Sequence, residues 1–311
     1  MCAAPCSILD LPSETLAVVC RHVQQQDLLA LASTSHRLSA VALRQLYRKT
    51  LLFTSSSRSG VFTLARNAEL AQHVRELDVV AHFDDADTLT EFITVLGQAL
   101  ANLIYAVDVR LSLRFGPAAA VKLPVTASRA LLAPVARSAC HTPDNTITTE
   151  YTQLRSFACD LALDDHMIQF LSRCPALVSL QLGESSSESL SSVANLAPTI
   201  VPNLEHLIAS PSAARVLVPG RPVSALDMTF TGEASGFDQE TLEAVAQSAA
   251  PLVVLNATTA DFHLEDLCRV ANTLGSQLCS LRMSVLNALD RAPDTVRHII
   301  WLADNCVNVC L

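Results

Sequence analysis

Acidic and histidine side chains gather at two places in the chain where they could bind a metal ion. The segment HFDDAD (82–87) offers nitrogen and oxygen ligands within six residues, and DDH (164–166) is similar. Both follow a strand-like segment and precede a helix-like one, where acidic residues cap a helix and suit its dipole. We therefore favour helix capping at both places and predict no metal and no cofactor.

Two further segments could carry chemistry. Cys140 and His141 could act as nucleophile and base, but sequence neighbours on an irregular segment rarely have that geometry. The serine-rich segment 184–192 is a solvated turn in our interpretation, with phosphorylation as the alternative. No glycine-rich phosphate loop or Ser/His/Asp order is present. We predict that the chain is not an enzyme, and a thiol or metal hydrolase remains the alternative.

The composition narrows the class of protein. Half of the 311 residues are apolar and the net charge is −9, which argues against a nucleic-acid binder. No apolar run is long enough to span a membrane, and the N-terminus lacks the pattern of a secretory signal. Ten scattered cysteines are most simply buried thiols. We expect a protein-binding protein of the cytoplasm or nucleus, with no membrane contact.

A repeat of the form L-x-x-L-x-L runs through the chain beyond residue 70. Helix-like segments at 87–100, 238–250, 264–274 and 294–303 separate several copies. This pattern predicts an α/β, leucine-rich-repeat-like solenoid over 51–311, with parallel strands and helices on the convex side. The second apolar position of the copies falls at Leu77, Val107 (a weaker copy), Phe157, Leu180, Leu207, Leu226, Leu255 and Leu281.

The predicted solenoid is irregular in three places. Residues 116–150 contain four prolines and no periodicity, which indicates an insertion. Only 19 residues separate Leu207 from Leu226, leaving room for one helical turn at most. Residues 305–311 begin another copy without completing it. Because an open solenoid end exposes apolar side chains, we expect a longer chain or a covering partner there.

The N-terminal stretch LPSETLAVVCRHVQQQDLLAL (11–31) predicts two short helices, and a third follows with a stripe over 38–46. Three helices in about 40 residues are too few to enclose a core of their own. We therefore expect this segment to expose apolar surface.

The same stretch resembles an F-box over residues 7–50. The resemblance rests on Leu11-Pro12-x-Glu14, Asp27-Leu28-Leu29 and Ser35-His36-Arg37, while Thr34 and Leu38 depart from the pattern. ALRQLYRKTLLF (42–53) is similar to the segment that follows the motif in fungal F-box proteins. The resemblance implies binding of a Skp-type adaptor, and through it a cullin–RING ubiquitin ligase. It assigns the adaptor contacts to Leu11, Pro12, Leu16, Leu28, Leu29 and Leu31.

If the F-box resemblance holds, the strands of the solenoid would bind the protein target of the ligase. Side chains that alternate with the inward apolar positions point away from the helices. This predicts target binding by Gln181, His206, Asp227, Asn256 and Arg282. The alternative is a leucine-rich-repeat scaffold or GTPase regulator whose N-terminal helices are only a cap.

Overall fold

The computed structural model forms two compact units, Met1–Ala120 and Val121–Leu311. The boundary falls within the predicted insertion. The residues that the structure describes are 8–53, 57–83, 86–115, 129–132, 134, 150–161, 163–183, 196–230, 237–259, 264–285 and 298–302. Most of the segment 116–150, and all of 140–141, 184–192 and 305–311, therefore lie outside the described residues.

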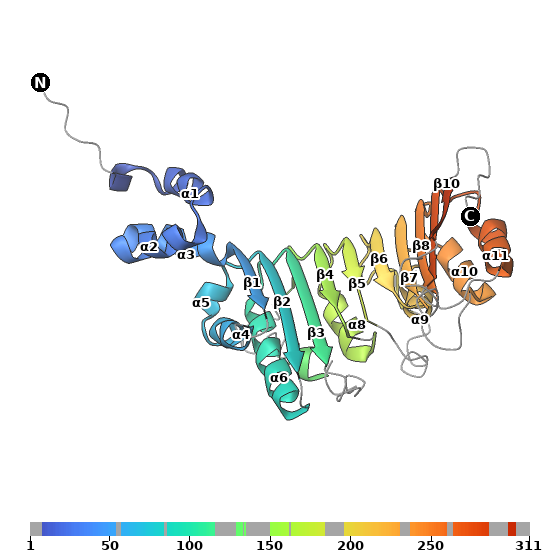
Figure 1. Ribbon diagram of the computed structural model, residues 1–311, viewed down its shortest axis with the longest axis horizontal. Helices are drawn as coiled ribbons and strands as arrows, with labels where there is room; N and C mark the ends of the chain where they lie inside the picture. Colours follow the sequence, from blue (N-terminus) through green and yellow to red (C-terminus); the bar gives the residue numbers. More distant parts are fainter. Residues whose placement is uncertain are drawn as a thin grey trace, which may run out of the picture. The chain divides into compact units, whose positions relative to one another are not determined.

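The first unit begins with three α-helices, called here the N-terminal helices. A 3-10 turn η1 (Ile8–Asp10) leads into α1 (Ser13–Arg21), α2 (Gln25–Thr34) and α3 (His36–Arg48) (Figure 1). Ser35 separates the last two helices because its extended backbone ends α2 and its hydroxyl accepts from the Leu38 N–H, 3.2 Å away, at the start of α3. The predicted three short helices are thus present.

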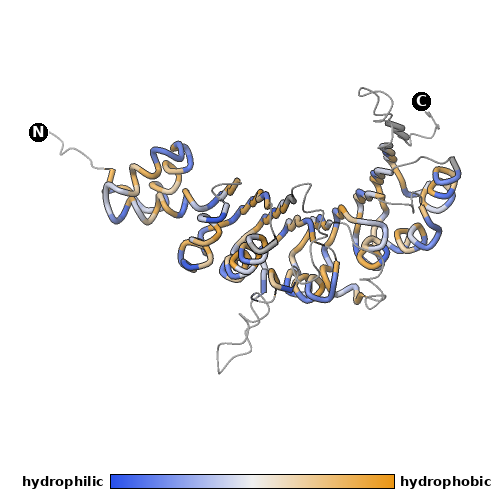
Figure 2. The backbone as a smooth tube through the Cα atoms, turned by 60° about the horizontal axis from the view of Figure 1, so that its bottom comes forward, coloured by the Kyte–Doolittle hydropathy of each residue, from blue (hydrophilic) through white to orange (hydrophobic). Residues whose placement is uncertain are grey.

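Parallel strands and helices follow in the same unit. Strands β1 (Lys49–Phe53), β2 (Glu76–Phe83) and β3 (Asp108–Phe115) pair in that order. Between them lie α4 (Ser57–Arg66), α5 (Ala68–Ala71) and α6 (Ala86–Asn102). The helices pack on one face of the strands (Figure 2), where the rings of Phe83 and Phe92 are 5.0 Å apart. The helix predicted at 87–100 is confirmed.

The second unit repeats the same arrangement. Six parallel strands pair in chain order: β4 (Ser156–Cys159), β5 (Ser179–Gln181), β6 (His206–Ala209), β7 (Ala225–Thr229), β8 (Val254–Thr259) and β9 (Ser280–Val285). The helices of this unit are α8 (Asp165–Leu171), α9 (Pro211–Leu217), α10 (Gln239–Ala246) and α11 (Leu264–Leu274). They lie on one face of the strands (Figure 2), as in a solenoid-like α/β fold.

The register of the second unit follows the sequence repeat. Six apolar residues occupy one row across β4–β9, and each is at most 1% exposed, so they form the inner layer against the helices. The predicted parallel α/β arrangement and the alignment of these copies are confirmed. The row consists of Phe157, Leu180, Leu207, Leu226, Leu255 and Leu281.

Three details of the prediction are wrong. Leu77 pairs with Val109, not Val107; both valines alternate with polar residues, so the repeat fits equally well two residues away. The 19-residue interval holds the seven-residue α9, about two turns rather than one. Residues His298–Leu302 form strand β10, antiparallel to β9, where a helix was expected over 294–303.

A buried arginine makes the short repeat possible. Arg221 is 0% exposed, and its guanidinium donates to six backbone carbonyls. Gly220, at φ 71°, turns the chain after α9 so that the next side chain can reach back to the C-terminal carbonyls of that helix. The desolvated guanidinium has a pKa lowered to about 10. The acceptors are the carbonyls of Leu196, Ala197, Ile200, Val216, Leu217 and Pro219.

Candidate protein-binding surfaces

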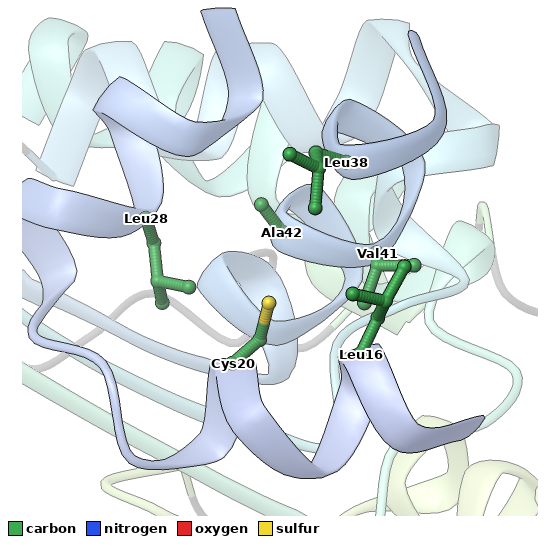
Figure 3. Close-up of a cluster of buried hydrophobic side chains, with 6 residues drawn as sticks. All are labelled: Leu16, Cys20, Leu28, Leu38, Val41 and Ala42. Atoms are coloured by element: carbon green, nitrogen blue, oxygen red, sulfur yellow. The ribbon is translucent and has the colours of Figure 1, made fainter. Parts of the chain in front are cut away.

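The N-terminal helices enclose a small core. Figure 3 shows that Leu16 and Cys20 of α1 point toward Leu28 of α2 and toward three residues of α3. These six side chains are all at most 7% exposed, so the expectation that three helices cannot enclose a core is wrong. The α3 residues of the core are Leu38, Val41 and Ala42.

The six predicted adaptor contacts differ in how far this core buries them. Leu16 and Leu28 lie inside it, at 1% and 5% exposure, and so offer no surface to a partner. Leu11 and Leu31 are partly buried against the core, whereas Pro12 and Leu29 are exposed. The resemblance places all six in the motif, but the helix geometry leaves only part of them accessible.

Large apolar side chains nevertheless remain exposed on the N-terminal helices. Leu29 is 56% exposed and Val18 is 52% exposed, and three more residues accompany them. Arg37 of α3 ties the η1 segment down by donating to the carbonyls of Leu9 and Leu11. The expectation of exposed apolar surface is therefore confirmed. Of the exposed residues only Leu29 belongs to the six assigned adaptor contacts, and the others are Ile8, Leu9, Val18 and Val19.

The predicted target-binding residues lie on the face of β4–β9 opposite the inner apolar row, called here the open face of β4–β9. Gln181, Asp227, Asn256 and Arg282 occupy one row across the strands. His206 lies on the same face in the adjacent row, between Ser179 and Ala225. All five residues are exposed or half-buried, so the strands bring together the set that the sequence predicts.

The sequence prediction missed two members of this row, Ala158 of β4, which lies opposite Gln181, and Ile208 of β6. Ile208 lies between Gln181 and Asp227 and is 37% exposed. It holds the same place in the repeat as its two neighbours, so alignment of the copies could have found it. From Gln181 to Arg282 the row therefore offers amide, apolar, acidic, amide and basic groups in order, so its charge is mixed.

Acidic and thiol groups of the kinds considered for metal binding and catalysis lie outside these two surfaces. Asp164 accepts from the Met167 N–H at 2.8 Å as the N-cap of α8, which confirms the capping interpretation there. Burial raises the pKa of the Cys159 thiol to about 12, so this thiol stays protonated and unreactive at neutral pH. Among the described residues no three His, Cys, Asp or Glu side chains gather as a metal site would require.

The described part of the chain also contains no helix with both the length and the apolar character to cross a bilayer. Comparison of the sequence with models of known protein families and with curated proteins finds no match.

Proposed function

We propose that this chain is the substrate-recognition adaptor of an SCF-type, cullin–RING ubiquitin ligase in the cytoplasm or nucleus. In this proposal the N-terminal helices bind a Skp-type adaptor and the open face of β4–β9 binds a protein target. The chain would supply no chemistry of its own and would act by holding the target near a ubiquitin-conjugating enzyme.

One observation carries the proposal: the N-terminal helices have their own core and still expose large apolar side chains. Ile8, Leu9, Val18, Val19 and Leu29 are each 39% or more exposed. Several exposed large apolar side chains within one short segment are more typical of a protein-binding site than of an ordinary surface. Together with the F-box resemblance of the same segment, this supports an adaptor that covers these side chains.

The alternative is a repeat scaffold or GTPase regulator in which these helices only cap the solenoid. The self-contained core of the N-terminal helices favours this alternative, because a cap also needs to be folded. The exposed apolar side chains disfavour it, because a cap uses its apolar side chains against its own repeats. Binding to the adaptor distinguishes the two functions.

The test is co-purification with a Skp-type adaptor. Leu29→Asp and Val18→Asp each place a charge on the exposed apolar surface, and desolvating that charge should lower adaptor affinity by about tenfold or more. Val253→Asp is the matched control, because Val253 is 39% exposed in the second unit. Circular dichroism checks that each variant is folded. Wild-type yields of adaptor with both variants would refute the F-box proposal.

A further inference from the structure

The first unit has an open face of its own, called here the open face of β1–β3, opposite α4 and α6. Along β1 the inward residue Leu52 is 8% exposed, whereas its neighbours Leu51 and Phe53 are 47% and 51% exposed. Since side chains alternate along a strand, these two residues share the open face. Large apolar groups with such exposure are costly to leave in water.

Strand register places an acidic residue beside this apolar pair. Leu51 lies opposite Asp78 of β2, which lies opposite Arg110 of β3. Phe53 lies opposite the half-buried Val80 in the next row. The open face of β1–β3 thus places three apolar side chains next to the Asp78 carboxylate, with further charged side chains beyond them.

The neighbouring charges are already paired with one another. The Nζ of Lys49 lies 3.2 Å from the Glu76 carboxylate. The Arg110 guanidinium donates to Asp108 at 3.0 and 3.3 Å. This hydrogen bond raises the Arg110 pKa, and so do the charge of Asp108 and, more weakly, those of Asp78 and Glu76. Of the described residues, none brings a cationic group within 4.0 Å of the Asp78 carboxylate. Asp78 is therefore the carboxylate in excess on this face.

We propose that Leu51, Phe53, Val80 and Asp78 bind a polypeptide segment of a partner that carries a Lys or Arg side chain flanked by apolar side chains. The cation would pair with Asp78 while the apolar groups cover β1. A second copy of this chain fits less well, because a two-fold contact would bring the Asp78 carboxylates together in a chain of net charge −9. This inference goes beyond the proposed adaptor function and does not depend on it.

The test uses fluorescence anisotropy of short labelled peptides with the purified 311-residue chain. One peptide alternates Leu and Val with Lys, and its partner has Glu in place of Lys. The Lys peptide should bind the wild type more tightly. Asp78→Arg should weaken the Lys peptide by about tenfold or more, since like charges would then meet, and should improve binding of the Glu peptide.

Three further variants complete the design. Leu51→Ser with Phe53→Ser should weaken both peptides, because it removes the apolar contact shared by them. Glu243→Arg makes the same charge change on the exposed side of α10 in the second unit and should alter neither affinity. Asp78→Asn, which preserves size, should give an intermediate loss and serves if Asp78→Arg does not fold.

Three results would overturn the inference. The first is an unchanged affinity of the Lys peptide for both Asp78 variants. The second is an equal loss with Glu243→Arg, which would mean general attraction to an acidic protein. The third is concentration-dependent self-association that Phe53→Ser abolishes, which would assign this face to a second copy of the chain.

Discussion

Leu28 and Leu29 are consecutive in α2, yet the first is 5% exposed and the second is 56% exposed. Successive helical residues point about 100° apart, so one leucine enters the core of the N-terminal helices and the other faces solvent. The two neighbouring leucines therefore differ physically: Leu28 contributes to folding, and Leu29 is accessible to a partner.

The first prediction separates these roles by stability. Leu28→Ala removes core packing and should lower the free energy of unfolding of the N-terminal helices by roughly 2–5 kcal/mol. Leu29→Ala should change it by no more than about 0.5 kcal/mol, as for an ordinary surface site. Amide exchange over residues 13–48 measures both. Equal loss of protection in the two variants would contradict the burial of Leu28.

The second prediction concerns Arg221. Arg221→Met removes the side-chain donor to six backbone carbonyls and should destabilise the second unit by about 3–5 kcal/mol in urea unfolding. Arg221→Lys should rescue only part of this, because an ammonium cannot reproduce the guanidinium fork.

The matched control for Arg221 is Arg215 of α9. Its Nη1 lies 2.7 Å from Glu240 of α10, in an ion pair whose acidic partner is 79% exposed. Such pairs contribute about 0–1 kcal/mol, so Arg215→Met should have little effect. Similar losses for the two methionine variants would show that burial of Arg221 does not matter.

The third prediction is a loss of stability above pH 9. Burial raises the pKa of the Cys159 thiol from 9.0 to about 12 and also raises the pKa of Cys174. Between these pH values the unfolded chain loses a proton that the folded chain keeps. Stability is therefore complete below pH 9 and falls as pH rises, by about 1.4 kcal/mol at pH 10 for Cys159 alone.

Urea unfolding at pH 8 and pH 10 measures this loss. Cys159→Ala should reduce the difference between the two pH values, whereas Cys279→Ala, which removes an exposed thiol, should not. An undiminished pH dependence in Cys159→Ala would mean that another group causes the loss.

The fourth prediction addresses the open face of β4–β9. Asp227→Lys combined with Arg282→Glu reverses two charges in one row and should leave folding intact, since surface changes cost about 0.5 kcal/mol or less. The set of proteins that co-purifies with the chain should change. Glu243→Lys on α10 is the control on the helix-covered side and should leave that set unchanged. The same partners with all variants would place target binding elsewhere.

Much of the fold was predictable because the buried inner row of the sheet corresponds to the repeated apolar positions of the sequence. The spacing from Leu180 to Leu281 fixes the register of five strands, since a shift by one residue would turn every apolar side chain outward. A shift by two residues keeps the apolar side chains on the same face. For this reason the sequence pattern placed Val107 where the structure has Val109. The run HIIWL (298–302) is apolar at nearly every position. It therefore shows no periodicity that would distinguish a helix from a strand.

The binding surfaces were less predictable because they depend on which side of an element is covered. The motif identifies Leu16 and Leu28 as important without saying that they face inward. Leu51 and Phe53 lie outside the repeat, so only the pairing of β1 with β2 brings them beside Asp78. The role of Arg221 was not predictable from the sequence, because only the fold brings its six carbonyl partners together.

Arg221 also links successive repeats in a way that affects how the second unit comes apart. Its guanidinium holds the segments before and after α9, while its own carbonyl accepts from Ser248 and Ala249, just before β8. In a repeat protein each interface adds a nearest-neighbour coupling energy, and opening propagates where that coupling is weakest. The repeats around β6, β7 and β8 should therefore open as one cooperative block. The shortest repeat couples its neighbours strongly and should not be the place where the second unit opens first.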